Sequence, residues 1–272
     1  MNQDFPGVYL PTSDPNTYES TPLANAGWYD EGQHGGSVAA LVVGHVEKVP
    51  TLAPMEISRI TVELFRVVPL VPLTIATTVV REGKKIQVLR AELTSQDGQL
   101  LGMAVVQRLR ITDRPAPDQE QVDLKLSLPK DTPMRPVGEP WGVGPPEKIM
   151  FHRNAIEFRE IYGGFDIPGP GAIWLRMRTQ IIAGEDVTPP QRAVAVADFC
   201  NGIARELDDG WLFMNPDLTV HLGRYPVGEW VALEAVSHYS DLGRGVAAGT
   251  LWDETGWVGR SAQTLFLEHV SG

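Results

Sequence analysis

The chain has 272 residues, of which 43% are hydrophobic and 21% charged, as in an ordinary globular protein and not in a disordered or fibrous one. At about 150 residues per domain, this length predicts one large domain or two fused units of similar size. The net charge of −11 lacks the basic surplus that binding to a nucleic-acid backbone requires, so we do not expect nucleic acid as the main partner.

Cysteine usage and the N-terminal residues bear on the compartment. Cys200 is the only cysteine, which excludes an intramolecular disulfide framework and any metal site built from several cysteines. The N-terminus has no basic segment followed by an apolar one, and the apolar stretch Val67–Val80 is short and interrupted by Pro69 and Pro72. We therefore expect a cytoplasmic protein with no membrane partner.

The first half of the chain is expected to form a short strand, a helix and four longer strands. A strand-like run surrounds Tyr18–Pro22, and Gly36–Glu47 is apolar nearly all round, which is typical of a buried helix. Four β-like stretches follow, at Ile60–Arg66, Leu73–Arg81, Lys85–Leu93 and Leu100–Leu109. An SQDG turn signal between the last two indicates an antiparallel hairpin.

The second half repeats this order after a proline-rich segment. Residues 112–150 contain eight of the 22 prolines and no periodic pattern, which predicts a linker. Two strand-like runs, Phe151–Arg159 and Ala172–Gln180, precede a second apolar helix, expected at Arg192–Glu206. Four β-like stretches follow again, with a DETG turn signal between the last two: Leu218–Arg224, Trp230–Tyr239, Gly245–Leu251 and Val258–Leu267.

A shift of 158 residues superimposes the two halves without a gap. It matches Thr61 with Thr219 and Leu64 with Leu222, and it yields nine identities in the fifty pairs from 61–110 against 219–268. Random pairing at average composition would give about three. Because the hydrophobic patterns agree as well, the sequence predicts an internal duplication, with an antiparallel meander wrapped around one buried helix in each half.

Four local strings carry a resemblance to a known family: GQHGGSVAAL, VAVADFCNG, NPDLTVHLGRYPVGEW and DETGWVGRSAQTLFLE. Together with the duplicated helix and meander, they resemble the thioesterase-like superfamily related to bacterial acyl-CoA thioesterase II, over nearly the whole chain except the proline-rich segment. The resemblance implies an α+β double hotdog fold, in which two curved antiparallel sheets, each wrapped around a helix, join into one sheet. We expect an N-terminal hotdog at residues 1–111, a linker at 112–146 and a C-terminal hotdog at 147–272.

Asp198 is the strongest catalytic candidate. It follows five apolar residues, 193–197, on a helix expected to be buried, and ionised side chains are seldom buried without a partner or a function. An exposed, salt-linked helix position is the alternative. In the family, an Asp, a Thr or Asn, and a Gln hold and activate the water that attacks the thioester, and the matching strings assign these roles to Asp198, Asn215 and Gln263. From residue type alone, Asn215 fits a turn cap and Gln263 an exposed strand position equally well.

The segment His34, Gly35 and Gly36 directly precedes the first helix. Glycine at such a place lets a ligand approach free backbone N–H groups at the positive end of the helix dipole. These N–H groups would stabilise a thioester oxygen as it becomes an oxyanion, so we expect the segment to bind substrate. A flexible helix start with His34 at the surface is the alternative.

The two helix starts are expected to share one site. In single hotdog thioesterases with an HGG helix start, a glycine of one protomer pairs with a carboxylate of the other. Nine residues separate His34 from Val43, as nine separate Pro189 from Asp198, so the first half has glycines without a carboxylate and the second half has the reverse. We therefore predict one working site per chain, in which Gly35 and Gly36 face Asp198.

Other chemistries find less support. The six histidines show no metal-ligand spacing, and no nucleophile elbow, phosphate loop or dinucleotide fingerprint appears, so neither a metal nor a cofactor is expected. Hydratases of the same fold carry a His five residues after the Asp, where this chain has Ile203. The predicted function is hydrolysis of fatty acyl-CoA in lipid metabolism, with a non-catalytic acyl-CoA or acyl-carrier binding protein and an enoyl-CoA hydratase as alternatives. Chain length, the residues that meet the CoA phosphates and assembly into homo-oligomers stay open.

Overall fold

The computed structural model describes residues 5–27, 32–112, 114, 124–135, 147–207 and 210–269. Its first half contains β1 (Gly7–Pro11), β2 (Thr17–Ser20), the turn η1 (Pro22–Ala24), α1 (Gly35–Glu47), β3 (Met55–Leu64), β4 (Leu73–Arg81), β5 (Ile86–Ser95) and β6 (Leu100–Arg110).

The second half contains more short elements before its meander. They are η2 (Pro129–Asp131), β7 (Met134–Arg135), η3 (Phe151–Ala155), β8 (Ile156–Tyr162), β9 (Gly171–Met177), β10 (Gln180–Ile182), α2 (Pro189–Ala197), α3 (Cys200–Ile203) and β11 (Trp211–Met214). The meander itself is β12 (Asp217–Leu222), β13 (Trp230–Tyr239), β14 (Arg244–Asp253) and β15 (Gly256–His269).

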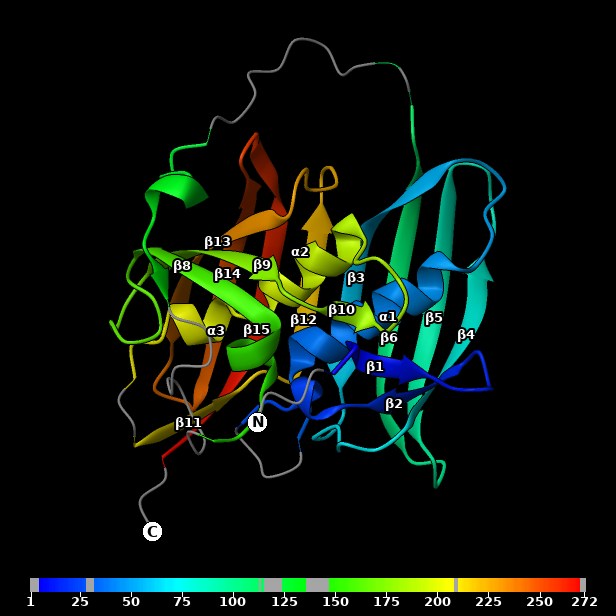
Figure 1. The fold of residues 1–272 in the computed structure, drawn as a ribbon, viewed down its shortest axis with the longest axis horizontal. Coiled ribbons are helices and arrows are strands. Elements are labelled where there is room, and N and C mark those ends of the chain that lie inside the picture. Colours follow the sequence, from blue (N-terminus) through cyan, green and yellow to red (C-terminus); the bar gives the residue numbers. More distant parts are fainter. Residues whose placement is uncertain are drawn as a thin grey trace.

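Within the described residues, fifteen strands form one continuous sheet that curves around α1 and α2 (Figure 1). The order β2-β4-β5-β6-β3 of the first half meets β12-β15-β14-β13-β9 of the second at the antiparallel pair β3–β12. In that pair Thr61 lies opposite Thr219, and their hydroxyl oxygens are 3.2 Å apart. These are two residues that the 158-residue shift matches, as expected where a strand pairs with its own duplicate across a two-fold axis. The predicted double hotdog with a continuous sheet is confirmed.

Helix α1 is buried on all sides, as its sequence predicts: every residue from Gly36 to Val46 is buried. Arg108 donates from Nη2 to the carbonyl of Val46 in the last turn of the helix, and from Nη1 at 2.8 Å to the carbonyl of Val49 just after it. The helix is therefore locked to the sheet at the end opposite His34. Among the described helices, none is long and apolar enough to cross a lipid bilayer.

The prediction of one helix over Arg192–Glu206 was wrong. The helix starts earlier, at Pro189, because proline suits the first turn and Thr188 and Gln191 form a reciprocal capping box before it. It also ends earlier, at Ala197, and a separate short helix, α3, follows from Cys200. Asp198 is the C-terminal cap of α2, so its side chain stands at a break between two helices.

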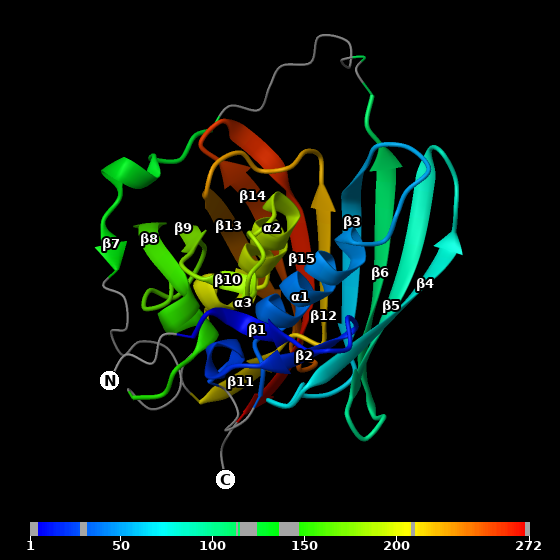
Figure 2. The same cartoon turned by 45° about the vertical axis from the view of Figure 1, so that its right-hand side comes forward.

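Three further predictions differ from the structure. Phe151–Arg159 begins with the π-helical turn η3 and becomes strand β8 only at Ile156, and Ala172–Gln180 is divided between β9 and β10. The strand-like run Tyr18–Pro22 belongs to β2 and η1, and β1 precedes it. Strand β10 pairs in parallel with β1 (Figure 2), so a strand from the second half forms the edge of the sheet next to the strands of the first half.

The predicted linker is described only in part. Residues 124–135 carry η2 and β7, and β7 pairs with β8 at the far edge of the sheet. Residues 113, 115–123 and 136–146 lie outside the described residues. The division into two hotdog units and a linker stays a prediction.

Candidate active site

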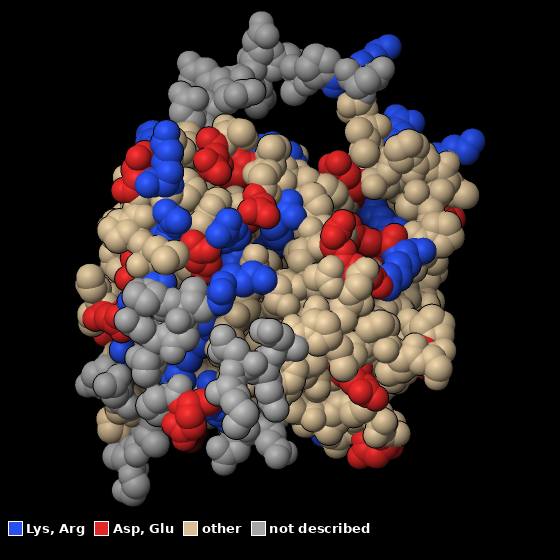
Figure 3. Space-filling view, in the orientation of Figure 1, with Lys and Arg blue, Asp and Glu red and all other residues tan. Residues whose placement is uncertain are grey.

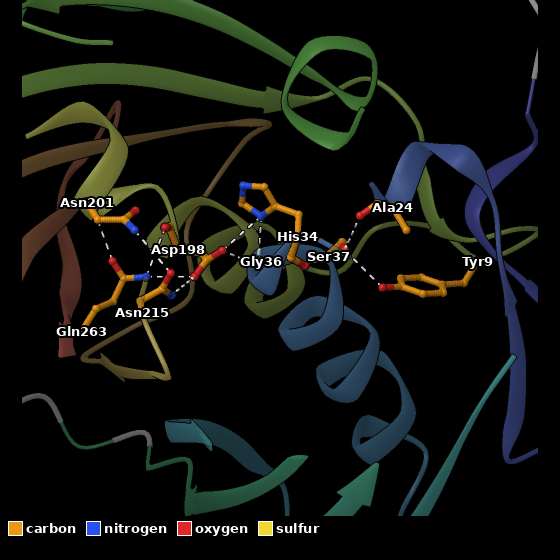
Figure 4. A network of polar contacts seen from close by, with 9 residues as sticks. All are labelled: Tyr9, Ala24, His34, Gly36, Ser37, Asp198, Asn201, Asn215 and Gln263. Atoms are coloured by element: carbon orange, nitrogen blue, oxygen red, sulfur yellow. Dashed lines mark hydrogen bonds and ion pairs between the residues drawn. The ribbon is translucent and has the colours of Figure 1, made fainter. Parts of the chain in front are cut away.

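The side chain of Asp198 is buried where α2 ends and α3 begins, with 5% of its surface exposed. Its Oδ1 accepts two hydrogen bonds, from Asn215 Nδ2 at 2.8 Å and from Gln263 Nε2 at 2.8 Å (Figure 4). A buried carboxylate needs such donors, because an unpaired buried charge is costly. The three residues that the resemblance assigns to catalysis therefore lie together in one hydrogen-bonded cluster.

The other carboxylate oxygen reaches the first half of the chain. Gly36 N–H donates to Asp198 Oδ2 at 2.6 Å, and His34 Nδ1 lies 3.0 Å from the same oxygen. His34 is the N-terminal cap of α1, and it is 9% exposed, so the alternative of a flexible histidine at the surface is excluded. The cluster thus joins the start of one helix to the end of the other (Figure 4).

The start of α1 lies so close to residues of the second half that only glycine fits there without a shift. A Cβ atom on Gly35 would lie 2.9 Å from Asp198 Oδ2 and 3.0 Å from Oδ1, and one on Gly36 would lie 2.6 Å from the Ala195 carbonyl oxygen. Carbon atoms do not approach that closely without a shift of their neighbours. Any side chain at either position would push the carboxylate or helix α2 away.

Asn201 is a member of the cluster that sequence analysis missed. Its backbone N–H donates to Gln263 Oε1 at 3.3 Å, and its Nδ2 donates to Asn215 Oδ1 at 3.3 Å. Gln263 Nε2 also donates to the Asp198 carbonyl at 3.1 Å, so Asn201 orients both amides toward the carboxylate. The available signal was its position three residues after Asp198, which on a helix places two side chains on the same face.

A cavity of about 370 Å³ opens onto the cluster. Its polar end is lined by His34, Gly35, Asp198, Asn201 and Asn215. Gln263 is not among the lining residues and is fully buried, so it acts on Asp198 from behind. The other walls are mostly apolar and come from both halves of the chain, including Leu64, Val67, Val68, Leu212, Phe213 and Phe266.

One basic side chain stands at this cavity. Arg66 lines it, and its side chain makes no hydrogen bond or ion pair with another described residue. Two other arginines are engaged elsewhere, since Arg224 pairs with Asp253 and Arg90 with Glu92. On the face of the molecule in Figure 3, Lys and Arg side chains alternate with Asp and Glu.

The duplicated counterpart of this site, where the start of α2 packs against α1, is filled by buried side chains. Gln191 is 3% exposed and donates from Nε2 to the Ala40 carbonyl at 3.2 Å, and a Cβ on Gly44 would overlap its amide. Val43 stands there instead of a carboxylate and is fully buried. The duplicated fold therefore has an open polar cluster at one helix start and a packed core at the other.

Two titratable groups beside the cluster stay neutral in the physiological range. Burial, the neighbouring His34 and the charge of Arg153 lower the pKa of His152 to about 3. Burial raises the pKa of the Cys200 thiol to about 12, and its Sγ lies 3.1 Å from Ser261 Oγ. A thiolate nucleophile at Cys200 is thereby excluded. Within the described residues, no group of three His, Cys, Asp or Glu side chains could hold a metal ion.

Fold and cluster together define a double hotdog with a carboxylate site between its halves. Two family matches agree with this class: the acyl-CoA thioesterase N-terminal domain matches residues 25–112, and the acyl-CoA thioesterase C-terminal domain matches residues 129–267. The chain belongs to the acyl-CoA thioesterase family. No curated protein matches it.

Solved structures share the fold across the whole chain at low sequence identity. Acyl-CoA thioesterase II TesB2 from Mycobacterium marinum is 14% identical, with a TM-score of 0.69 over 96% of both chains. The tesB protein of Mycobacterium avium subspecies paratuberculosis is 14% identical, with a TM-score of 0.68 over 93% of this chain and 92% of that one. A hot dog fold protein from Alicyclobacillus acidocaldarius is 17% identical, with a TM-score of 0.73 over 96% of both.

Proposed function

We propose that the protein hydrolyses fatty acyl-CoA thioesters to the free acid and CoA, with Asp198 as the base that activates water. The observation that carries this proposal is the meeting of the buried Asp198 carboxylate with the Gly36 N–H of the other half, beside a largely apolar cavity. A carboxylate within reach of a bound water is a suitable general base, and an apolar cavity suits an acyl chain.

The start of α1 is proposed to polarise the thioester carbonyl, through one of the two expected glycines and not through both. Gly36 N–H already donates to Asp198, so it fixes the base. Gly35 lines the cavity, and within the described residues no acceptor is bound by its N–H. We therefore assign to Gly35 N–H, at the positive end of the helix dipole, the stabilisation of the developing oxyanion.

The reaction then needs no covalent bond to the protein. Water attacks the carbonyl carbon while its proton passes to Asp198, and the tetrahedral oxyanion forms at the Gly35 N–H. The C–S bond breaks, and the proton leaves Asp198 for the thiolate, so acid and thiol are released and the carboxylate is restored. Gln263 is a positioning residue on this proposal, because it holds Asp198 without lining the cavity.

Arg66 is proposed to bind an anionic part of the substrate, for which the phosphates of CoA are the natural source. It lines the cavity, and no acidic partner within the described residues occupies it. A cytoplasmic location and a role in lipid metabolism remain predictions, as does any assembly of double hotdog chains.

Thiol release from acyl-CoA substrates of increasing length tests the proposal. The variant Asp198→Asn cannot take the proton, so its kcat should fall by about 10² to 10⁴-fold, with a loss of stability of about 1–3 kcal/mol from the weakened hydrogen bonds. Asp241→Asn, the same change on an exposed turn, is the matched control and should leave kcat unchanged.

Each alternative function predicts a different result in that experiment. A wild-type protein that binds acyl-CoA but releases no thiol would be the non-catalytic binder. A protein that consumes the double bond of an enoyl-CoA without releasing thiol would be a hydratase. Near-normal hydrolysis by Asp198→Asn would remove Asp198 from the mechanism.

A further inference from the structure

The contact between His34 and Asp198 implies a specific place for one proton. His34 Nδ1 and Asp198 Oδ2 lie 3.0 Å apart, and both side chains are buried. An ionised carboxylate oxygen offers only lone pairs, and so does an imidazole nitrogen that carries no proton. Two such atoms at hydrogen-bonding distance repel each other unless a proton lies between them.

The Gly36 N–H donates to both atoms, but unequally. It lies 2.6 Å from Asp198 Oδ2 and 3.1 Å from His34 Nδ1, so its stronger bond is to the carboxylate. A proton on Nδ1 gives up the weaker of these two bonds and satisfies the contact between the imidazole and the carboxylate. Asp198 then accepts four hydrogen bonds, two at each oxygen, and the neutral ring keeps its lone pair at Nε2.

The ring of His34 is held in the orientation that this bond requires. It packs against Phe199, with ring centroids 4.7 Å apart, and against Phe151, with centroids 5.1 Å apart, and these two rings also contact each other. Both aromatic side chains are buried, so water has little access to the ring faces. An imidazole fixed this way has one nitrogen directed at Asp198, and Figure 4 shows the other nitrogen directed away from it.

We propose that the base of this enzyme is the His34–Asp198 pair, in which His34 donates its Nδ1 proton to Asp198 and shares the proton that water releases. The inference rests on the proposed function. As water forms the C–O bond, its O–H bond breaks and the pair gains one proton. When the C–S bond breaks, the pair returns that proton to the thiolate sulfur, so the enzyme ends as it began. His34 acts through Asp198 and is a positioning residue.

Few other groups near the pair can contribute to its pH dependence. His152 faces it from η3, with Arg153 close to His152, Cys200 from α3 and Arg66 from the cavity wall. His152 has its pKa lowered to about 3 and Cys200 has its pKa raised to about 12, both by burial, while arginines keep their charge. Between pH 5 and 9, neither His152 nor Cys200 therefore changes its charge.

The test is His34→Asn, measured as kcat, KM and their pH profiles for thiol release. Asparagine keeps the N-terminal cap of α1 and can donate an amide N–H to Asp198, but it cannot share a proton. We expect kcat to fall by about 100-fold with KM changed by less than about threefold. The acid limb of kcat should also move, which a merely structural role of His34 would not cause.

His45→Asn is the matched control. His45 is a buried histidine at the other end of the same helix, where its Nδ1 lies 2.9 Å from the Tyr18 hydroxyl. This variant should lose stability and keep the wild-type kcat and pH profile. Equal effects of the two substitutions on kcat would assign both to helix packing and overturn the proposal.

A second measurement does not depend on activity or on the folding of a variant. In wild-type protein labelled with ¹⁵N-histidine, the His34 imidazole should show the neutral tautomer protonated at Nδ1 at pH 8. The Nε2-protonated tautomer would overturn the proposal, and so would a His34→Asn enzyme with wild-type kcat and acid limb. If the wild-type protein releases no thiol, the proposed function fails, while the tautomer still decides whether the pair exists.

Discussion

Replacing Gly35 with alanine would place a methyl group against the Asp198 carboxylate. The new carbon would lie 2.9 Å from Oδ2, 3.0 Å from Oδ1 and 3.2 Å from Cγ. The carboxylate has little freedom to retreat, because Asn215, Gln263 and Gly36 each hold it by a hydrogen bond. The substitution therefore displaces the base without changing any of its partners.

The expected cost follows from two opposing effects. Overpacking a tight site destabilises by about 1–3 kcal/mol, while alanine in place of glycine in a helix stabilises by about 0.5–1 kcal/mol. We expect a net loss of about 0–2 kcal/mol, which leaves a folded enzyme. A displaced base is more serious for catalysis, since a misplacement of about 1 Å lowers rates by about 100-fold.

Gly44→Ala is the matched control, because it makes the same change on the same helix at the closed counterpart site. Its Cβ would overlap the Gln191 amide, so stability should fall while kcat stays at the wild-type value. Thiol release and thermal unfolding of both variants provide the comparison. A Gly35→Ala enzyme with full kcat would refute the reasoning, and equal losses of kcat in two folded variants would refute the single site.

Three further outcomes are expected. Asn215→Ala, which removes one donor to Asp198, should lower kcat by about 10- to 100-fold, and Asn215→Thr, with a hydroxyl donor, should recover part of it in the same assay. Burial alone raises the pKa of Asp253, but hydrogen bonds from Arg224 and Thr255 outweigh it and lower the pKa to about 2. The ionised Asp253 therefore stabilises the fold above a pH of about 4, and this stabilisation is lost as the pH falls toward 2. In urea unfolding, Asp253→Asn should be less stable than wild type by about 1–3 kcal/mol at pH 7. The difference should be smaller at pH 2.5. Cys200 should not react with a thiol reagent at pH 8 unless the protein is unfolded, because burial raises its pKa to about 12.

Much of the fold could be predicted because the duplication has a direct structural meaning. The 158-residue shift that matches Thr61 with Thr219 corresponds to the strand pair in which these two residues lie opposite each other. The strand periods and the two glycine turns then define the meanders, since Gly98 and Gly256 adopt the positive φ that their turn signals imply. Hydrophobic period and turn chemistry are local properties, so one sequence is enough to show them.

The details of the site depend on contacts that no local pattern shows. The break after Ala197 coincides with the bonds from Asp198 to Gly36 and Gln263, which are 162 and 65 residues away along the chain. Likewise, the sequence shows that glycines start α1, but only the packing of α2 shows that Gly36 N–H is already bound to the carboxylate.

A single turnover of acyl-CoA in ¹⁸O-labelled water, with excess enzyme, tests most directly the claim that Asp198 activates water at this site. The account predicts release of the thiol together with ¹⁸O in the free acid, and no label in the peptide that contains Asp198. Label in the Asp198 carboxylate would show that it attacks the thioester itself, and would contradict the account, as would failure to release acid and thiol.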